Sequence, residues 1–276
     1  MHSGPALVDP DVSDRDMLLF QQLFKRYIGL HLPVSKKALL QSRLGGRLHE
    51  LGLRELGQYH AMIAAADGAA ERQRAIDLIT TNETYFFREQ GHFDFLCSEF
   101  LPAWSGAKTL RAWSAASSTG EEAYTLAMLL DHHRPNAAWS VFASDISTRV
   151  LSFARRALYP MARGQNIPKA YLRRYCLRGT GEYEGHFLVD GELRRKVEFG
   201  QRNLTDLDAA DDGDFDLIFL RNVIIYFDFP TKVQVVRSVI ERLKPGGYLV
   251  VGHSESLHGM DLGLEMHSPS IYRKPQ

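Results

Sequence analysis

The sequence has no surplus of charge, since its 276 residues include 33 basic and 33 acidic side chains. Proteins that bind nucleic acid or work on an anionic membrane surface normally carry a basic excess, so the balance argues against both kinds of partner. Long apolar runs are also missing, because no stretch approaches the ~20 residues that a membrane-spanning helix needs. The polar, acidic start of the chain lacks the basic and apolar regions of a signal peptide. We therefore expect a soluble, cytoplasmic protein that is not inserted into a membrane.

Cysteine is nearly absent from the sequence. Cys97 and Cys176 lie far apart and belong to no CxxC or CxxH pattern, which argues against a disulfide framework and against a zinc site. The simpler interpretation is two inert thiols in a reducing compartment, and we expect no metal centre. With 45% hydrophobic residues the chain can still bury an ordinary core and leave room for a smaller accessory domain.

Helical periodicity marks the first part of the chain. Apolar residues recur at helical spacing from Met17 to Tyr27 and again from Ala38 to Leu48, so we expect a helical domain over residues 1–80. The second helix and the residues around it carry a basic face, opposed by Glu50 and formed by Lys36, Lys37, Arg43, Arg47 and Arg54. Such a face is either solvated surface or a docking site for an acidic partner.

From about residue 109 the pattern changes to short apolar runs that alternate with amphipathic stretches. Strands are expected at 109–115, 139–145, 196–201, 215–220 and 247–252, and helices at 121–133, 147–157 and 231–243. This alternation predicts an α/β fold over residues 81–276, with a doubly wound, mostly parallel sheet that binds its ligand beyond the carboxyl ends of the strands. The alternation breaks at about 171–195, where glycines, aromatics and an Asp-Gly turn predict an inserted β-subdomain.

A loop of small residues, WSAASSTGEEAY, joins the first strand to its helix. Of the GxGxxG pattern it keeps only Gly120. Glu121 and Glu122 stand where backbone N–H groups would receive a diphosphate, and their charge would repel one while suiting the cation S-adenosylmethionine. In the alternative interpretation the glutamates only cap the helix, because Ser118 and Thr119 each begin an S/T-x-x-E capping box.

Polar residues also follow the next two strands. Asp145 ends the second strand, where a carboxylate can accept both hydroxyls of a ribose; alternatively it caps the helix that starts near Ser147. Asn203 in QRNLTD can hydrogen-bond adenine through its amide while Leu204 packs against the ring. Taken by itself, however, Asn203 would be a turn asparagine.

Two motifs mix amides, hydroxyls, aromatics and arginines in a way that structural loops rarely need. They are TNETYFFRE at residues 81–89 and FDLIFLRNVIIYFDFP at residues 215–230. Because the second runs on from a strand, Arg221 and Asn222 should face the same crevice as Asp145. Structural alternatives remain open, with Arg88 in a salt bridge and Tyr226 as an aromatic cover over the core.

The sequence resembles the chemotaxis receptor methyltransferases (the CheR family) in the order and spacing of six motifs. They are TNETYFFRE, WSAASSTGEEAYTLAM, FASDIS, QRNLTD, FDLIFLRNVIIYFD and LKPGGYLVVGHSESL, which span about residues 80 to 256. The resemblance implies a class of enzyme that transfers a methyl group from S-adenosylmethionine to glutamate side chains of chemoreceptors and releases S-adenosylhomocysteine. It also implies an N-terminal domain that docks on the receptor's helical cytoplasmic domain, and a β-subdomain that in some members grips a C-terminal receptor tether peptide.

The same resemblance assigns site residues. The catalytic residues would be Arg88 and Tyr226, nearest the transferred methyl, with a role in placing the acceptor carboxylate rather than in moving a proton. Ser117 departs from a familiar alanine without touching a proposed role. The alternatives are a non-catalytic S-adenosylmethionine-binding regulatory protein and a methyltransferase with another substrate. The residues implied to line the donor site are Asn82, Thr84, Arg88, Glu122, Asp145, Asn203, Leu204, Arg221 and Asn222.

Overall fold

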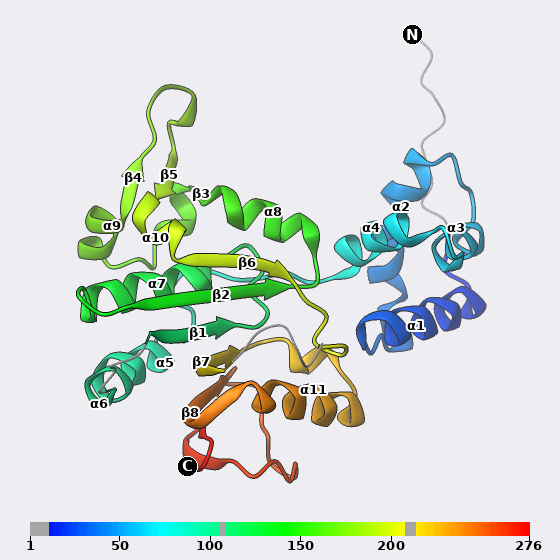
Figure 1. Ribbon diagram of the computed structural model, residues 1–276. Coiled ribbons are helices and arrows are strands. Elements are labelled where there is room, and N and C mark those ends of the chain that lie inside the picture. The colour runs from blue at the N-terminus through cyan, green and yellow to red at the C-terminus, as the bar shows by residue number, and fades with distance from the viewer. Residues whose placement is uncertain (1–10, 105–108, 208–213) are drawn as a thin grey trace. The chain divides into compact units, whose positions relative to one another are not determined.

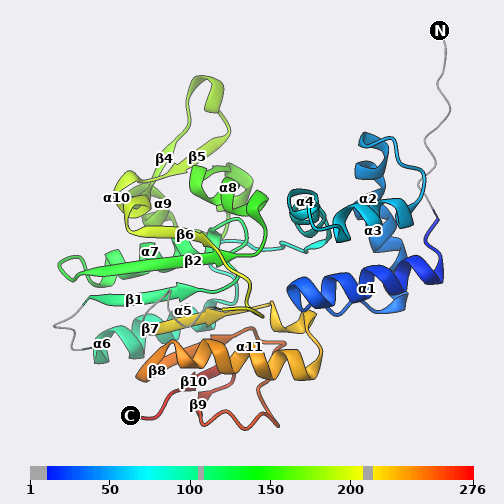
Figure 2. The ribbon, with the colours of Figure 1, turned by 45° about the vertical axis from the view of Figure 1, so that its right-hand side comes forward.

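The computed structural model describes residues 11–104, 109–207 and 214–276. This part of the chain forms two compact units, shown as ribbons in Figures 1 and 2. The first contains residues 11–81 together with Tyr226–Asp228, and the second contains the other described residues. Within these ranges no helix is long and apolar enough to cross a membrane.

The first unit is helical, as the sequence predicts. Its first helix, α1, begins at the capping box that Ser13 and Asp16 form and ends at Gly29, whose φ of 69° suits glycine. Apolar residues such as Phe20 and Leu44 are fully buried between the helices. The helices of this unit are α1 (Asp14–Ile28), η1 (Val34–Lys36), α2 (Lys37–Glu50), α3 (Leu56–Ala64) and α4 (Ala69–Ile79).

The second unit is built on a mostly parallel sheet, which confirms the predicted fold class. Its described strands lie in the order β6-β2-β1-β7-β8-β10-β9, and antiparallel pairing is confined to the pairs that β10 makes with its two neighbours. The C-terminal pair β9 and β10 was not predicted, and β8 begins four residues before the expected strand. The strands are β1 (Leu110–Ser114), β2 (Trp139–Asp145), β6 (Val197–Gln201), β7 (Phe215–Leu220), β8 (Leu243–Val251), β9 (Glu265–Ser268) and β10 (Ile271–Arg273).

The order in which successive strands are added to the sheet reverses between the parallel neighbours β1 and β7. From β1 the chain moves outward to β2 and β6, whereas from β7 it moves the other way to β8. Since parallel crossovers are right-handed, α7 and α11 cover opposite faces of the sheet. A ligand crevice is expected at such a reversal. The helices around the sheet are α5 (Gln90–Phe95), η2 (Leu96–Phe100), α6 (Leu101–Ala103), α7 (Glu121–His133), α8 (Thr148–Arg156), η5 (Ile224–Tyr226) and α11 (Phe229–Glu241).

A second, antiparallel sheet is inserted between α8 and β6, and its hairpin projects from the main sheet in Figures 1 and 2. Its order is β3-β5-β4, so it takes in Leu158–Pro160, which precedes the predicted insertion. The Asp-Gly pair is not a turn between strands, because Asp190 caps α10 by accepting the N–H of Glu192 at 2.8 Å. The elements are β3 (Leu158–Pro160), η3 (Met161–Gly164), α9 (Lys169–Tyr175), β4 (Cys176–Arg178), η4 (Gly181–Tyr183), β5 (His186–Val189) and α10 (Gly191–Arg195).

Candidate functional site

A buried ion-pair network lies at the carboxyl ends of β1 and β7. Arg221, directly after β7, is 5% exposed and donates from Nη1 to Oε2 of Glu122 at 2.8 Å. Ser114 at the end of β1 donates its hydroxyl to the other Glu122 oxygen at 2.6 Å. Burial raises the pKa of Glu122, although the Arg221 charge and the Ser114 hydrogen bond act in the opposite direction. The network therefore joins the first turn of α7 to the loop after β7.

Glu89 supports Arg221 from the other side. Its Oε2 lies 3.0 Å from Nη2 of Arg221 and accepts the N–H of His253 at 3.1 Å, while its Oε1 accepts from Asn222 at 3.2 Å. Burial opposes ionisation of Glu89, but Arg221 and these hydrogen bonds outweigh it and hold the pKa of Glu89 below its usual range. The sequence reasoning quoted Glu89 in its motif without giving it a role.

Glu89, His92 and His253 form a group whose ligand atoms lie within 4.8 Å of one another. Burial is the largest cause that lowers the pKa of His92 to about 3, which leaves its imidazole neutral. The Glu89 oxygens, however, already accept three N–H groups, and the Arg221 charge lies beside them. We therefore interpret the group as support for Arg221 rather than as a metal centre.

A second carboxylate, Glu255, fixes the loop after β7 to the loop after β8. It is 5% exposed and accepts backbone N–H groups from Asn222 at 2.7 Å, Gly252 at 2.8 Å and Ile225 at 3.3 Å. A side chain at Gly252 would lie 2.6 Å from Nδ2 of Asn222, so glycine is required there. Glu255 holds Asn222 in its left-handed backbone conformation, with φ of 57°.

The loop between β1 and α7 is held by Asp145, at the carboxyl end of β2. Asp145 is 8% exposed, and its two oxygens accept the N–H groups of Ser118 and Ser147, each at 2.9 Å. Asp145 is not the cap of α8, because Ser147 is the N-cap residue and its hydroxyl accepts from Val150. The carboxylate therefore organises the loop at the place where the sequence predicts a ribose.

The capping box that was the alternative interpretation for Glu121 and Glu122 does not form. Among the described residues no side chain caps this helix, whose N-cap is Gly120. Ser118 donates its hydroxyl to the carbonyl of Asn82, and Thr119 donates to the side chain of Glu121. A side chain at Gly120 would lie 2.9 Å from Cβ of Ala154, and φ is 94° there. Close packing and the positive φ thus explain why residue 120 is glycine, without a ligand.

The other predicted donor-site residues follow β6 or precede α5. Asn203 follows β6, and its Oδ1 accepts from both the backbone and the hydroxyl of Thr205, at 3.2 and 2.8 Å. In this respect it is a turn asparagine. Leu204 is buried beside it at 8% exposure. Asn82 meets the loop through its carbonyl, and Thr84, two residues on, is partly buried.

The two predicted catalytic residues have different surroundings. Arg88 is partly buried and donates to the carbonyl of Glu83 at 2.8 Å, while its own carbonyl accepts from Arg221. The salt bridge considered for it is therefore a hydrogen bond to backbone. Tyr226 belongs to the segment Tyr226–Asp228 of the helical unit, where its carbonyl accepts the N–H of His31 at 2.8 Å.

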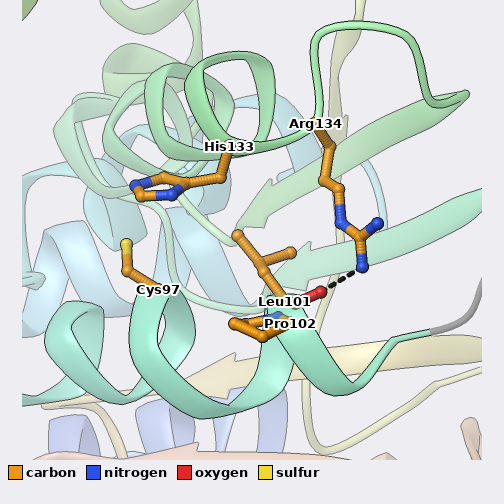
Figure 3. Close-up of a pocket in the computed structure, with 5 residues that line it drawn as sticks. All are labelled: Cys97, Leu101, Pro102, His133 and Arg134. Atoms are coloured by element: carbon orange, nitrogen blue, oxygen red, sulfur yellow. Dashed lines mark hydrogen bonds between the residues drawn. The ribbon is translucent and has the colours of Figure 1, made fainter.

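A separate pocket lies at the other end of α7 (Figure 3). Arg134 points across it to the carbonyl of Leu101, and His133 lies above Cys97. A helix of this length spans about 20 Å, so the pocket lies away from the crevice. Burial raises the pKa of the Cys97 thiol to about 11, which leaves it protonated and weakly nucleophilic.

The groups at the carboxyl ends of β1, β2 and β7 fit S-adenosylmethionine better than a dinucleotide. The N–H of Ser118 is taken by Asp145, and the N–H of Gly120 by the carbonyl of Ser117 at 2.9 Å, so neither is offered to a phosphate. Carboxylates at Glu122 and Asp145 would add repulsion. These same carboxylates and the nearby amides provide acceptors for hydroxyl and ammonium groups, which S-adenosylmethionine carries.

Comparison with known proteins covers nearly the whole chain. Residues 82–272 match the family described as CheR methyltransferase, SAM binding domain, and residues 15–80 match the CheR methyltransferase all-alpha domain. The chain is 39% identical to a chemotaxis protein methyltransferase of Salmonella typhimurium, covering 95% of this chain and 90% of that protein. It is 38% identical to one of Escherichia coli, with 95% and 91% covered, and 39% identical to one of Pseudomonas aeruginosa, with 91% and 92% covered.

Proposed function

Because the chain belongs to the CheR methyltransferase family, it is an S-adenosylmethionine-dependent methyltransferase of chemoreceptors, and we propose that it esterifies glutamate side chains from a donor site around Glu122, Asp145 and Arg221. The observation that carries this site is that a carboxylate in the first turn of α7, a strand-end carboxylate and a buried arginine all lie at the carboxyl ends of β1, β2 and β7. The remaining residues of the proposed site lie in the motif before α5 or follow the carboxyl ends of β6 and β7. They are Asn82, Thr84, Arg88, Asn203, Leu204 and Asn222.

In this proposal the donor site works by placement. S-adenosylmethionine supplies a sulfonium-bound methyl group and becomes S-adenosylhomocysteine, while a glutamate oxygen forms the new ester bond. A glutamate is ionised at neutral pH, so no residue has to act as a general base. Holding the reacting atoms roughly 3–3.5 Å apart contributes about 7–11 kcal/mol through orientation.

We propose Arg88 and Tyr226 as the residues nearest the transferred methyl. The planar guanidinium of Arg88 suits a carboxylate, and a tyrosine hydroxyl can orient one of its oxygens. The hydrogen bond from Arg88 to the carbonyl of Glu83 supports this role, because it holds the side chain without neutralising it by a carboxylate. In this proposal the Arg88 guanidinium is held in place by a backbone carbonyl, and its positive charge attracts the carboxylate of the acceptor glutamate.

The test of the function is methyl transfer to membranes that contain chemoreceptors. We expect labelled methyl groups from S-adenosylmethionine to enter receptor protein and to be released as volatile methanol by alkali, which identifies an ester. Label that enters small molecules or nucleic acid would favour a different substrate. Donor binding without any alkali-labile product would favour the regulatory alternative.

We propose that the basic face of the helical unit docks on the acidic helices of the receptor, but with a smaller set of residues than the sequence indicates. Arg47 is held within the unit by a two-point ion pair with Glu71, at 2.9 and 2.7 Å, and by Glu50. Lys37 is paired with Asp14. The proposed docking residues are therefore Lys36, Arg43 and Arg54.

Charge reversal at these positions tests the docking proposal. The double variant Arg43→Glu and Arg54→Glu is expected to raise the KM for receptor about tenfold at low salt and to flatten its dependence on salt, because complementary charge mainly steers association. Affinity for S-adenosylhomocysteine should not change. Arg15→Glu, an exposed site on α1, is the matched control. If the control and the double variant changed the KM for receptor equally, the basic face would be ordinary solvated surface and not a docking site.

A receptor tether peptide at the β-subdomain is also proposed. β4 lies at an edge of the described antiparallel sheet, and its Leu177 is 55% exposed, which suits addition of a peptide strand. Receptors with and without their C-terminal tails, compared in the same methyl-transfer assay, separate tethered from untethered action. The cytoplasmic location expected from the sequence belongs to this proposal too, since the proposed acceptor is the receptor's cytoplasmic domain.

A further inference from the structure

The loop between β1 and α7, residues 115–120, is called the donor loop. Glu121, the first residue of α7, directly follows it and faces away from the Arg221 network, toward the small antiparallel sheet. Glu121 is 0% exposed, and its Oε2 accepts the hydroxyl of Thr119 at 2.6 Å. Its Oε1 is paired with the guanidinium of Arg163, which lies in η3 directly after β3. A carboxylate buried in this way is costly unless it is paired, so the inserted subdomain supplies a cation that the loop requires.

The subdomain touches the same loop at a further point. Tyr159 of β3 donates its hydroxyl to the carbonyl of Thr119 at 2.7 Å, and Arg163 also donates to the hydroxyl of Thr119 at 3.1 Å. On its other side the loop binds the proposed donor-site residues, because Ser118 donates to Asp145 and to the carbonyl of Asn82. Residue 119 is thus fixed by the subdomain, and residue 118 by the donor site.

Because neighbouring residues of the loop are bound on both sides, a shift at Thr119 would also displace Ser118. Ser118 has a positive φ of 49°, a conformation that a residue other than glycine keeps only when surrounding contacts support it. Glu121 is followed directly by Glu122, the partner of Arg221. A shift of Glu121 toward solvent would therefore move both the loop and the first turn of α7.

We infer that Arg163 is a positioning residue: through Glu121 and Thr119 the inserted subdomain holds the donor loop in the conformation that binds S-adenosylmethionine. The inference rests on the proposed donor site and deepens it, because it makes donor affinity depend on a part of the fold that does not touch the strand ends. It also gives Glu121 a task different from that of its neighbour Glu122.

Binding of S-adenosylhomocysteine, measured by calorimetry on the full chain, tests the inference. Arg163→Met leaves Glu121 buried without its cation, and we expect affinity to fall about tenfold at pH 8. Arg163→Lys should recover part of the loss. Adding Glu121→Gln to Arg163→Met removes the uncompensated charge, so the double variant should return to within about threefold of wild type. The matched control is Arg156→Met, an exposed arginine of α8.

The pH dependence separates this role from simple packing. Burial raises the pKa of Glu121, so in Arg163→Met a lower pH should protonate this carboxyl group and relieve the penalty. The groups that face Glu121 are Arg163 and Tyr159, and burial also raises the pKa of Tyr159 well above its usual value, so Tyr159 does not titrate between pH 6 and 8. We expect the loss in Arg163→Met to shrink to about threefold at pH 6 and the double variant to show no such change.

The outcomes are distinct. A folded Arg163→Met that binds as tightly as wild type overturns the inference, and so does a loss that neither Glu121→Gln nor lower pH reduces. Circular dichroism and thermal unfolding show whether each variant is folded. If Arg163→Met does not fold, the affinities of the double variant and of Arg163→Lys test the inference in its place. If wild type itself does not bind S-adenosylhomocysteine, the proposed function fails instead.

Discussion

Replacing Arg221 by methionine is expected to abolish measurable methyl transfer and to lower the free energy of unfolding of the second unit by about 3–5 kcal/mol. Arg221 is 5% exposed and lies between Glu122 and Glu89, at 2.8 and 3.0 Å. Without the guanidinium the two carboxylates face each other in a buried site. Thermal unfolding and the kcat/KM for receptor methylation measure the two effects.

The sign of the pH effect provides a second check on Arg221. Unpaired buried carboxyl groups have raised pKa values in the folded state, so they contribute stability below about pH 4.5 that is lost as the pH rises through the folded-state pKa. The destabilisation by Arg221→Met should therefore be larger at pH 8 than at pH 5, and Glu122→Gln in the same chain should reduce it.

Arg242→Met is the control for the loss of a buried arginine. Arg242 is 8% exposed and donates to the carbonyl of Ser238 at 2.7 Å, just before β8 and so at the amino end of the sheet. We expect this variant to keep the specific activity of the folded protein. If Arg221→Met also kept it, the ion-pair network would have no part in donor binding.

Replacing Asp145 by alanine is expected to weaken binding of S-adenosylhomocysteine about 100-fold. Two hydrogen bonds to a charged group contribute roughly 3 kcal/mol together, and a ribose offers two hydroxyls to this carboxylate. Part of the effect comes from the loop, because the N–H groups of Ser118 and Ser147 lose their acceptor. Calorimetry gives the affinity, and Asp145→Asn, which keeps one strong acceptor, should lose less.

The control for Asp145 is a carboxylate at the opposite, amino end of the parallel strands. Asp216, near the amino end of β7, is paired with Lys244 at 2.8 Å and accepts the N–H of Arg111. Asp216→Ala should lower stability yet leave the affinity for S-adenosylhomocysteine within about threefold of wild type. If Asp145→Ala and Asp216→Ala bound S-adenosylhomocysteine with equal affinity, Asp145 would not be a donor-site residue.

The sequence predicts the main elements of the fold well where their periodicity is strong. The helix expected at 121–133 has the same ends in the structure, and the strand expected at 139–145 does too. The strands β3, β9 and β10 were missed because three or four residues are too few for an alternating pattern to be recognised.

The rule that ligands bind at strand carboxyl ends places Asp145 and Arg221 at the same end of the sheet, but it does not predict how the residues there pair. Arg221 and Glu122 are 99 residues apart in the sequence, and Asn222 and Glu255 are 33 apart, so no local pattern links them. The capping box does not form because Ser118 adopts a positive φ and donates its hydroxyl to the carbonyl of Asn82, 36 residues away. Thr119 donates its hydroxyl to the side chain of Glu121 instead of accepting a backbone N–H of the helix.

We propose that Glu122, Asp145, Asn203 and Arg221 together form the one site that receives the methyl donor. A crystal structure of the full chain with S-adenosylhomocysteine tests it most directly. The ribose hydroxyls should lie within hydrogen-bond distance of the Asp145 carboxylate, with the adenine beside Asn203 and Leu204 and the amino acid end toward Arg221. Nucleoside density elsewhere on the molecule, with these side chains making no contact to it, would contradict the account.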